Sequence, residues 1–125
     1  MVNCKRILVV DGEERLTFLL QQSLKSLGQG YEILTAQAGE EALTKIREKP
    51  FDLIITDYRL QDMGGLQLTA AIKVFTPDTP VVLMTAYSSE ELEAEAKRLR
   101  VYRYITKPFP IEEIKDIIKE ALQTA

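Results

Sequence analysis

Five short apolar runs recur along the 125-residue chain, and each has the length of a β-strand. They cover residues 7–10, 31–36, 53–56, 81–84 and 102–105. The first, third and fourth runs, ILVV, LIIT and VVLM, are continuously apolar, which is typical of strands covered on both faces of a parallel sheet. The second and fifth runs mix apolar and polar residues, and this predicts that these two strands lie at the edges of the sheet.

A segment with helical character follows each run. In four of these segments apolar residues recur with helical spacing: Leu16, Leu19, Leu20, Leu24 and Leu27; Ala42, Leu43 and Ile46; Leu66, Leu68, Ala71, Ile72 and Phe75; and Ile111, Ile114, Ile117, Ile118, Ala121 and Leu122. The helix after the fourth run is expected to begin at Ser88, because Ser88 and Glu91 have the spacing of a capping box.

Strict alternation of strands and helices predicts an α/β fold, in which a parallel sheet is covered by helices on both faces. The version with five units is the flavodoxin-like (βα)5 three-layer sandwich, with strand order 2-1-3-4-5. The length is that of one domain, which we expect to span residues 1–125. In this fold ligands bind outside the carboxyl ends of the strands, where the strand order reverses.

Composition narrows the chemistry that such a site can carry. The chain has one cysteine and no histidine, so an internal disulfide and the usual Cys/His zinc sites are excluded and any metal must be a hard, oxygen-liganded one. A net charge of -3 disfavours direct binding to nucleic acid or to anionic membranes. No apolar run is long enough to span a membrane or to form a signal-peptide core, so a cytoplasmic protein is expected.

Four chemically complementary residues stand at four of the predicted strand ends, namely Asp11, Asp57, Thr85 and Lys107. Each has an ordinary explanation when taken alone, such as a turn-forming aspartate or a solvated surface lysine. Together they supply carboxylate ligands for Mg²⁺, a hydroxyl donor and an ammonium that neutralises phosphoryl charge. One of the carboxylates can also act as a nucleophile.

The segments VVDGEE, DLIITDYRLQDMGG, VVLMTAYSS and YRYITKPF resemble, in order and spacing, the response-regulator receiver domains of two-component signalling. The resemblance runs from about residue 6 to the end of the sequence. It implies that Asp57 accepts a phosphoryl group from the phosphohistidine of a sensor histidine kinase. It also implies that Asp11, Asp57 and the backbone carbonyl of Arg59 hold Mg²⁺, and that Thr85 and Lys107 bind the phosphoryl oxygens.

The resemblance extends to the parts that respond to phosphorylation. Tyr104 matches the aromatic switch position of the family, whose ring turns inward as the hydroxyl of Thr85 moves toward the phosphate. The bond between Lys107 and Pro108 matches one that is cis in the family. The implied protein phosphorylates itself and is not a turnover enzyme.

One departure from the family concerns the metal. Receivers usually carry two adjacent acids after the first strand, whereas here Gly12 follows Asp11. A ligand and a negative charge are therefore missing, which predicts weak Mg²⁺ binding, unless Glu13 supplies the ligand instead. Gln61 stands where the loop after the acceptor commonly has proline, and this predicts a looser loop.

Several alternatives remain open at this stage. Gly12 favours a pseudo-receiver, an interaction module of the same fold that phosphorylation does not regulate. A phosphatase or phosphotransferase would need an acid at Arg59, and a flavin carrier would need a less acidic turn after the first strand. Output is expected through the face formed by the fourth helix, fifth strand and fifth helix, toward an output domain, a downstream protein or a second copy. The exposed side of the fourth helix is acidic, with Glu90, Glu91, Glu93 and Glu95.

Overall fold

The computed structural model describes residues 4–28 and 30–123, and it has the predicted three-layer α/β architecture. Five parallel strands form one sheet in the order β2-β1-β3-β4-β5. The strands are β1 (Lys5–Val10), β2 (Tyr31–Ala36), β3 (Leu53–Asp57), β4 (Val81–Thr85) and β5 (Arg103–Thr106). The helices are α1 (Glu14–Leu24), α2 (Gly39–Glu48), α3 (Gly65–Phe75), α4 (Glu90–Arg98) and α5 (Ile111–Leu122), with a short 3-10 turn over Lys25–Leu27.

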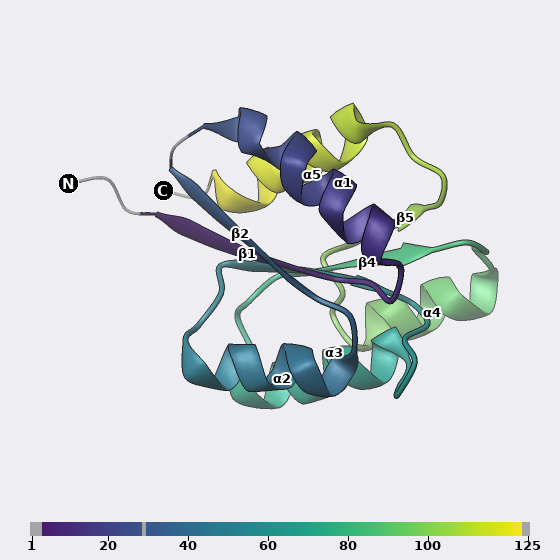
Figure 1. Cartoon of the computed structure of the whole chain (residues 1–125). Helices are drawn as coiled ribbons and strands as arrows, with labels where there is room; N and C mark the ends of the chain where they lie inside the picture. The colour runs from purple at the N-terminus through teal and green to yellow at the C-terminus, as the bar shows by residue number, and fades with distance from the viewer. Residues whose placement is uncertain (1–3, 29, 124–125) are drawn as a thin grey trace.

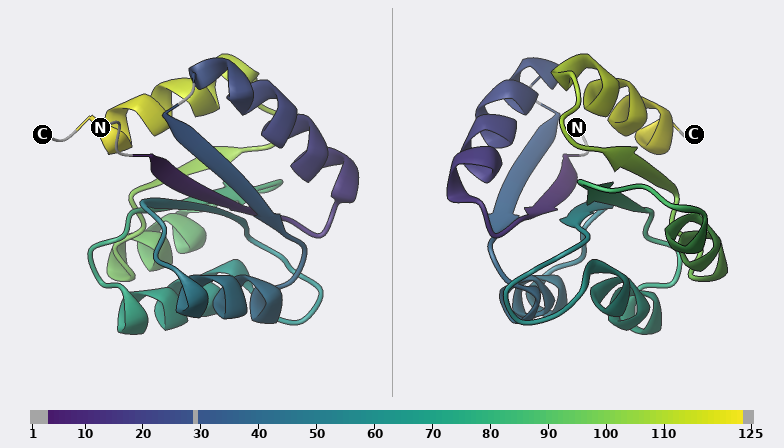
Figure 2. Two further views of the ribbon diagram at one scale, coloured as in Figure 1. Left: turned by 60° about the vertical axis from the view of Figure 1, so that its left-hand side comes forward. Right: turned by 90° about the vertical axis from the view of Figure 1, so that its right-hand side faces the viewer.

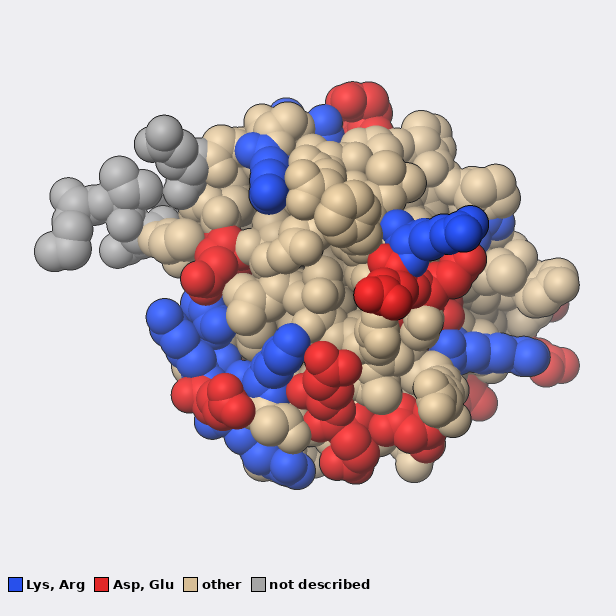
Figure 3. Space-filling view, in the orientation of Figure 1, with Lys and Arg blue, Asp and Glu red and all other residues tan. Residues whose placement is uncertain are grey.

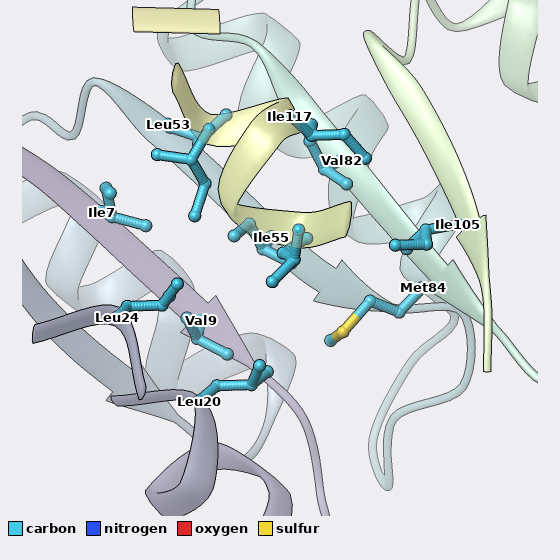
Figure 4. Packing of buried hydrophobic residues seen from close by; sticks show 12 residues of the cluster. Ile7, Val9, Leu20, Leu24, Leu53, Ile55, Val82, Met84, Ile105 and Ile117 are labelled. Atoms are coloured by element: carbon cyan, nitrogen blue, oxygen red, sulfur yellow. The ribbon is translucent and has the colours of Figure 1, made fainter. Parts of the chain in front are cut away.

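The sheet lies between two layers of helices (Figures 1 and 2), and a hydrophobic cluster lies on each of its faces. Helices α1 and α5 cover one face, where Ile7 and Val9 of β1 point (Figure 4). Helices α2 and α3 cover the other face, where Leu8 and Val10 point. Successive side chains of a strand point to opposite faces, so a strand covered on both sides must be apolar at every position. This explains the continuously apolar runs of β1, β3 and β4.

The two mixed runs form the edge strands, as their patterns predicted. β5 begins one residue later than expected, at Arg103, although the N–H of Tyr102 already donates to the carbonyl of Val81 at the start of β4. Two of the apolar residues with helical spacing are largely exposed, Leu19 at 53% and Phe75 at 49%. The inner positions of their helices are already filled by buried neighbours, for example Leu20 in α1 and Ile72 in α3.

Helix α4 begins one residue later than the capping-box spacing predicted. Its N-cap is Ser89, whose hydroxyl accepts a hydrogen bond of 3.1 Å from the backbone N–H of Leu92. Ser88 is not the cap, because the loop after β4 continues through it. The loop is held by Thr85, whose hydroxyl bonds to the backbone of Tyr87.

Charged side chains follow the dipoles of the helices. Helix α2 has Glu40 and Glu41 in its first turn and Lys45 and Arg47 in its last, an arrangement that complements the helix dipole. In Figure 3 red side chains gather over the start of this helix, while its end is mostly blue with some red among it. Within the part of the chain that the structure describes, no helix is long and apolar enough to cross a membrane.

Candidate functional site

The carboxyl ends of four strands bring the predicted residues together. Asp57 and Thr85 end β3 and β4, while Asp11 and Lys107 follow β1 and β5. Three of these residues line a cavity of about 140 Å³. The cavity is lined by Asp57, Tyr58, Arg59, Thr85, Ala86, Tyr87 and Lys107. Asp11 joins the group through its contact with Lys107.

Lys107 bridges the two carboxylates. Its Nζ lies 2.7 Å from Asp11 Oδ2 and 3.1 Å from Asp57 Oδ1. The Asp11 side chain is 3% exposed, and those of Asp57 and Lys107 are 17% and 20% exposed. Charges this shielded from water interact more strongly than surface ion pairs do. The ammonium therefore holds the site together and is also placed to meet an anion delivered to Asp57.

Asp11 and Asp57 share the Lys107 ammonium unequally, and the pKa values of Asp57 and Lys107 reflect this. Burial and the charge of Asp11 raise the pKa of Asp57, and the hydrogen bond and charge of Lys107 offset this only in part. Burial alone would lower the pKa of Lys107, but its bonds to Asp11 and Asp57 raise it overall. The two directions are compatible because Nζ lies closer to Asp11 than to Asp57. Asp57 is thus the incompletely neutralised member, and a further positive charge would favour its ionised form.

Asp11 also shapes the loop that it begins. Its Oδ1 accepts a hydrogen bond of 2.8 Å from the backbone N–H of Glu13, and its own N–H donates to the carbonyl of Ala36 at the end of β2. The turn-forming explanation therefore holds for this residue, and its contact with Lys107 leaves room for a functional role as well. One oxygen fixes the entry to α1 while the other faces Lys107.

The hydroxyl of Thr85 points toward the β4–α4 loop. It donates to the carbonyl of Tyr87 at 2.8 Å and accepts from the N–H of Tyr87 at 3.1 Å. The carbonyl of Thr85 accepts from the N–H of Lys107, which ties the ends of β4 and β5 together. For this hydroxyl to donate to a phosphoryl oxygen on Asp57, it must give up the bond that it donates to the carbonyl of Tyr87.

The donor set suits a hard cation with few protein ligands. Mg²⁺ is commonly bound by one or two carboxylates, keeping several waters, and Asp11, Asp57 and the nearby backbone of Arg59 fit that pattern. Within residues 4–28 and 30–123, no three Asp, Glu, Cys or His side chains gather closely enough to hold a metal. Glu13 is therefore not grouped with the two aspartates. At Gly12 an added Cβ would meet only the carbonyl of Gln37, at 3.8 Å, so packing does not require a glycine there.

Tyr104 does not line the cavity next to Asp57. It is partly buried in β5 and lines a separate cavity of about 270 Å³ next to α4, together with Glu93 and Lys97. Its switch role stays a prediction. The bond between Lys107 and Pro108 is cis, as the resemblance implied.

A larger apolar groove beside the Asp57 cavity was not predicted from the sequence. It has a volume of about 520 Å³ and shares Ala86 and Lys107 with the smaller cavity next to Asp57. Its walls come from α1 and from the segment leading into α5: Glu13, Leu16, Leu19, Pro108, Phe109 and Ile111. The only sequence signal was an excess of apolar residues in α1, which also includes Phe18, 61% exposed.

Comparisons with known proteins agree with this arrangement. Residues 7–119 match the family model described as the response regulator receiver domain. The transcriptional regulatory protein ZraR of Klebsiella oxytoca is 40% identical over 116 residues, which are 93% of this chain and 26% of ZraR. The chain thus spans about a quarter of the length of the curated relatives it matches.

Two solved structures share the fold closely. A CheY-like response regulator receiver domain protein from Methanospirillum hungatei superposes with a TM-score of 0.91 at 30% identity, covering 97% of this chain and 95% of that one. The receiver domain dimer of beryllofluoride-activated NtrC4 superposes with a TM-score of 0.87 at 34% identity, covering 94% and 96% of the two chains.

Proposed function

The chain belongs to the response regulator receiver domain family of two-component signalling, and from this premise we propose that Asp57 accepts a phosphoryl group from the phosphohistidine of a sensor histidine kinase. One observation carries the proposal. Lys107 bridges Asp11 and Asp57 beside a cavity of about 140 Å³ that opens next to the Asp57 carboxylate. The nucleophile Asp57, the buried carboxylate of Asp11 and the ammonium of Lys107 thereby lie next to one another.

In the transfer, a carboxylate oxygen of Asp57 attacks phosphorus as the bond from phosphorus to the histidine nitrogen breaks. The released imidazole takes a proton from water, and an acyl phosphate remains on Asp57. The ammonium of Lys107, already 3.1 Å from Asp57, neutralises charge on the phosphoryl oxygens. Asp11, Asp57 and the carbonyl of Arg59 would hold Mg²⁺, which supplies further positive charge to the same oxygens. The reaction is stoichiometric, so the protein is not a turnover enzyme.

The acyl phosphate then shifts an existing conformational equilibrium. We propose that the Thr85 hydroxyl turns its O–H from the carbonyl of Tyr87 to a phosphoryl oxygen and that Tyr104 turns inward in response. The changed surface is the face formed by α4, β5 and α5. The dimer of the activated NtrC4 receiver supports association of two copies as one form of output, and an attached output domain or a downstream protein is another.

The apolar groove beside the acceptor suits the phosphodonor. A donor histidine must reach Asp57 through the opening next to Lys107 and Ala86, and both residues also line the groove. A kinase helix that covers Leu19 and Phe109 would place its histidine at this opening. The encounter takes place in the cytoplasm.

Intact mass after incubation with acetyl phosphate and Mg²⁺ tests the proposal. The native chain should gain one phosphoryl group and Asp57→Asn none. An adduct that survives in Asp57→Asn would remove Asp57 from the acceptor role. A native chain that gains none, even with phosphorylated kinases, would favour the pseudo-receiver alternative, for which the missing acid at Gly12 is the motivating observation.

A further inference from the structure

We propose that Asp62 is a positioning residue, which holds the acceptor loop in place by capping helix α2. The acceptor loop is defined here as residues 57–65, between β3 and α3. The proposal rests on the proposed function, because it assigns Asp62 a part in shaping the Asp57 site. Asp62 itself contacts neither Asp57 nor Lys107 among the described hydrogen bonds and ion pairs.

The contact joins two segments that are distant in sequence. Asp62 Oδ1 accepts from the N–H of Gly39 at 2.8 Å, and Oδ2 accepts from the N–H of Glu40 at 2.9 Å. Both donors belong to the first turn of α2, where backbone N–H groups have no partner within the helix. The N-cap of α2 is Ala38, which has no side-chain acceptor. The helix therefore takes its cap from the acceptor loop.

A second contact also holds the acceptor loop against the start of α2. The side chain of Met63 packs directly against Gly39, and an added Cβ at that position would collide with it. The tip of the loop is thus held by an apolar contact and by two charge-assisted hydrogen bonds. These bonds lower the pKa of Asp62, the one to Glu40 most strongly, so the carboxylate is ionised at neutral pH.

Movement at the tip is transmitted to the acceptor because the loop is closed on itself. Arg59 and Gly64 form an antiparallel bridge, and the N–H of Leu60 donates to the carbonyl of Met63 at 3.0 Å. At the base, the N–H of Gly65 donates to the carbonyl of Tyr58 at 2.7 Å. A shift of the segment 62–64 must therefore displace the backbone of Arg59, two residues from Asp57.

Asp62 is the polar part of the attachment of this loop. Leu60 and Met63 pack against a hydrophobic cluster, and Gln61 between them is exposed and has ordinary backbone freedom, whereas a proline would fix one of its dihedral angles. Asp62 adds the charged hydrogen bonds to α2 beside these apolar contacts. We infer that Asp62 sets the position of the Arg59 carbonyl and so the affinity of the acceptor site for a cation.

The test compares Asp62→Ala with a matched control, Glu41→Ala. Glu41 lies at the same end of α2, where it accepts from the N–H of Gln37 at 2.9 Å and pairs with Lys45 at 3.4 Å. It is not hydrogen-bonded to the acceptor loop in the part of the chain that the structure describes. Both variants weaken the start of α2, and only Asp62→Ala releases the loop. Asp62→Asn, which keeps one acceptor oxygen, should fall between native and Asp62→Ala.

The first readout needs neither metal nor phosphoryl donor. Amide hydrogen exchange of Leu60 and Gly65 should accelerate in Asp62→Ala and stay native in Glu41→Ala. The second readout is Mg²⁺ titration followed by the amide shifts of Asp57 and Arg59. Affinity should fall about tenfold in Asp62→Ala, the scale for losing a group that orients a metal ligand, and stay native in Glu41→Ala.

The proposal is overturned if Asp62→Ala leaves the exchange of Leu60 and Gly65 and the Mg²⁺ affinity as in Glu41→Ala. Asp62 would then be only a cap for α2. Should Asp62→Ala not fold, Asp62→Asn is judged by the same two readouts. Failure of the proposed function looks different, because the native chain would then take up no phosphoryl group while the exchange of the loop amides still responded to Asp62.

Discussion

Lys107 donates a hydrogen bond to Asp11 across the carboxyl end of the sheet, with 2.7 Å between Nζ and Oδ2, although 96 residues separate the two in sequence. The same ammonium reaches Asp57 at 3.1 Å. The segment after β5 is therefore attached to the site around Asp57 through this ammonium. In the proposed function, a phosphoryl group on Asp57 would change which anion the Lys107 ammonium pairs with, and this would link β5 directly to the chemistry.

Replacing Lys107 with alanine should lower the free energy of unfolding by about 1 to 2 kcal/mol, less than for a fully buried pair because Lys107 is 20% exposed. The loss arises from two carboxylates left without their common counter-ion. Urea unfolding measures it, and Asp57→Asn in the same chain should restore part of it.

The same variant should uncouple phosphorylation from the conformational change. Once Asp57 is phosphorylated, the amide shift of Tyr104 should move less in Lys107→Ala than in the native chain. Equal shifts in both proteins would show that Lys107 has no coupling role.

Asp57→Asn should stabilise the protein at neutral pH by about 1 kcal/mol, the usual scale of a single substitution. The pKa of Asp57 is raised in the folded state by burial and by Asp11, so the folded chain binds the proton more tightly than the unfolded chain. Stability contributed by this group is present while Asp57 is protonated and is lost as pH rises from the ordinary aspartate range through the folded pKa.

Urea unfolding of both chains across the acidic range checks this prediction. The advantage of Asp57→Asn should be small in acid and should grow as pH rises. The pKa of Asp62 is lowered, so this group makes the free energy of unfolding depend on pH in the opposite sense. Because Asp62 is present in both proteins, its contribution cancels in the difference between the native chain and Asp57→Asn. An advantage that is independent of pH would mean that the Asp57 charge is not the cause.

The sequence predicted the parts of the molecule that depend on local pattern. Continuous apolar runs identified the three central strands, and alternation with helices gave their order. Asp57, at the end of β3, and Lys107, just after β5, were therefore expected to lie close together. The Asp62 cap on Gly39 and the outward direction of Leu19 could not be predicted, because each depends on how two segments distant in sequence pack.

The orientation of Thr85 could not be predicted for a related reason. Its position at the end of β4 follows from the strand pattern. Whether its hydroxyl faces Asp57 or the loop depends on its rotamer, which is fixed by hydrogen bonds to the backbone of Tyr87. The pattern of apolar and polar residues does not predict a side-chain rotamer.

Leu19→Asp should slow phosphotransfer from a histidine kinase about tenfold, since burying a charge in place of an apolar contact costs more than 1 kcal/mol at a well-packed interface. Leu19 is 53% exposed on the wall of the apolar groove. The phosphodonor would be the histidine kinase that phosphorylates the native chain fastest among a panel of purified, autophosphorylated kinases. Val74→Asp is the control, because Val74 is 81% exposed on α3 and outside the groove.

Acetyl phosphate separates docking from chemistry in this experiment. A small donor needs no groove, so it should phosphorylate Leu19→Asp at the native rate. If Leu19→Asp slows both donors equally, the substitution has disturbed the acceptor site, and the groove is not a docking surface for the kinase.

Gly12→Asp should tighten Mg²⁺ binding by about tenfold, or ~1.4 kcal/mol. The new carboxylate adds a ligand oxygen and a negative charge, and a unit charge ~4 Å from a doubly charged ion contributes about 8 kcal/mol at an effective dielectric of ~20 before dehydration is subtracted. The side chain has room, because its Cβ would meet only the carbonyl of Gln37, at 3.8 Å.

The chain has no tryptophan, so the titration follows the amide shifts of Asp11, residue 12 and Asp57. Glu13→Ala is the informative partner variant. Its affinity should equal that of the native chain, because Glu13 is not gathered with the two aspartates. If Glu13→Ala instead abolishes binding while Gly12→Asp changes little, Glu13 moves in to serve as the third ligand. The native site would then be complete, and the pseudo-receiver alternative would lose the observation that motivates it.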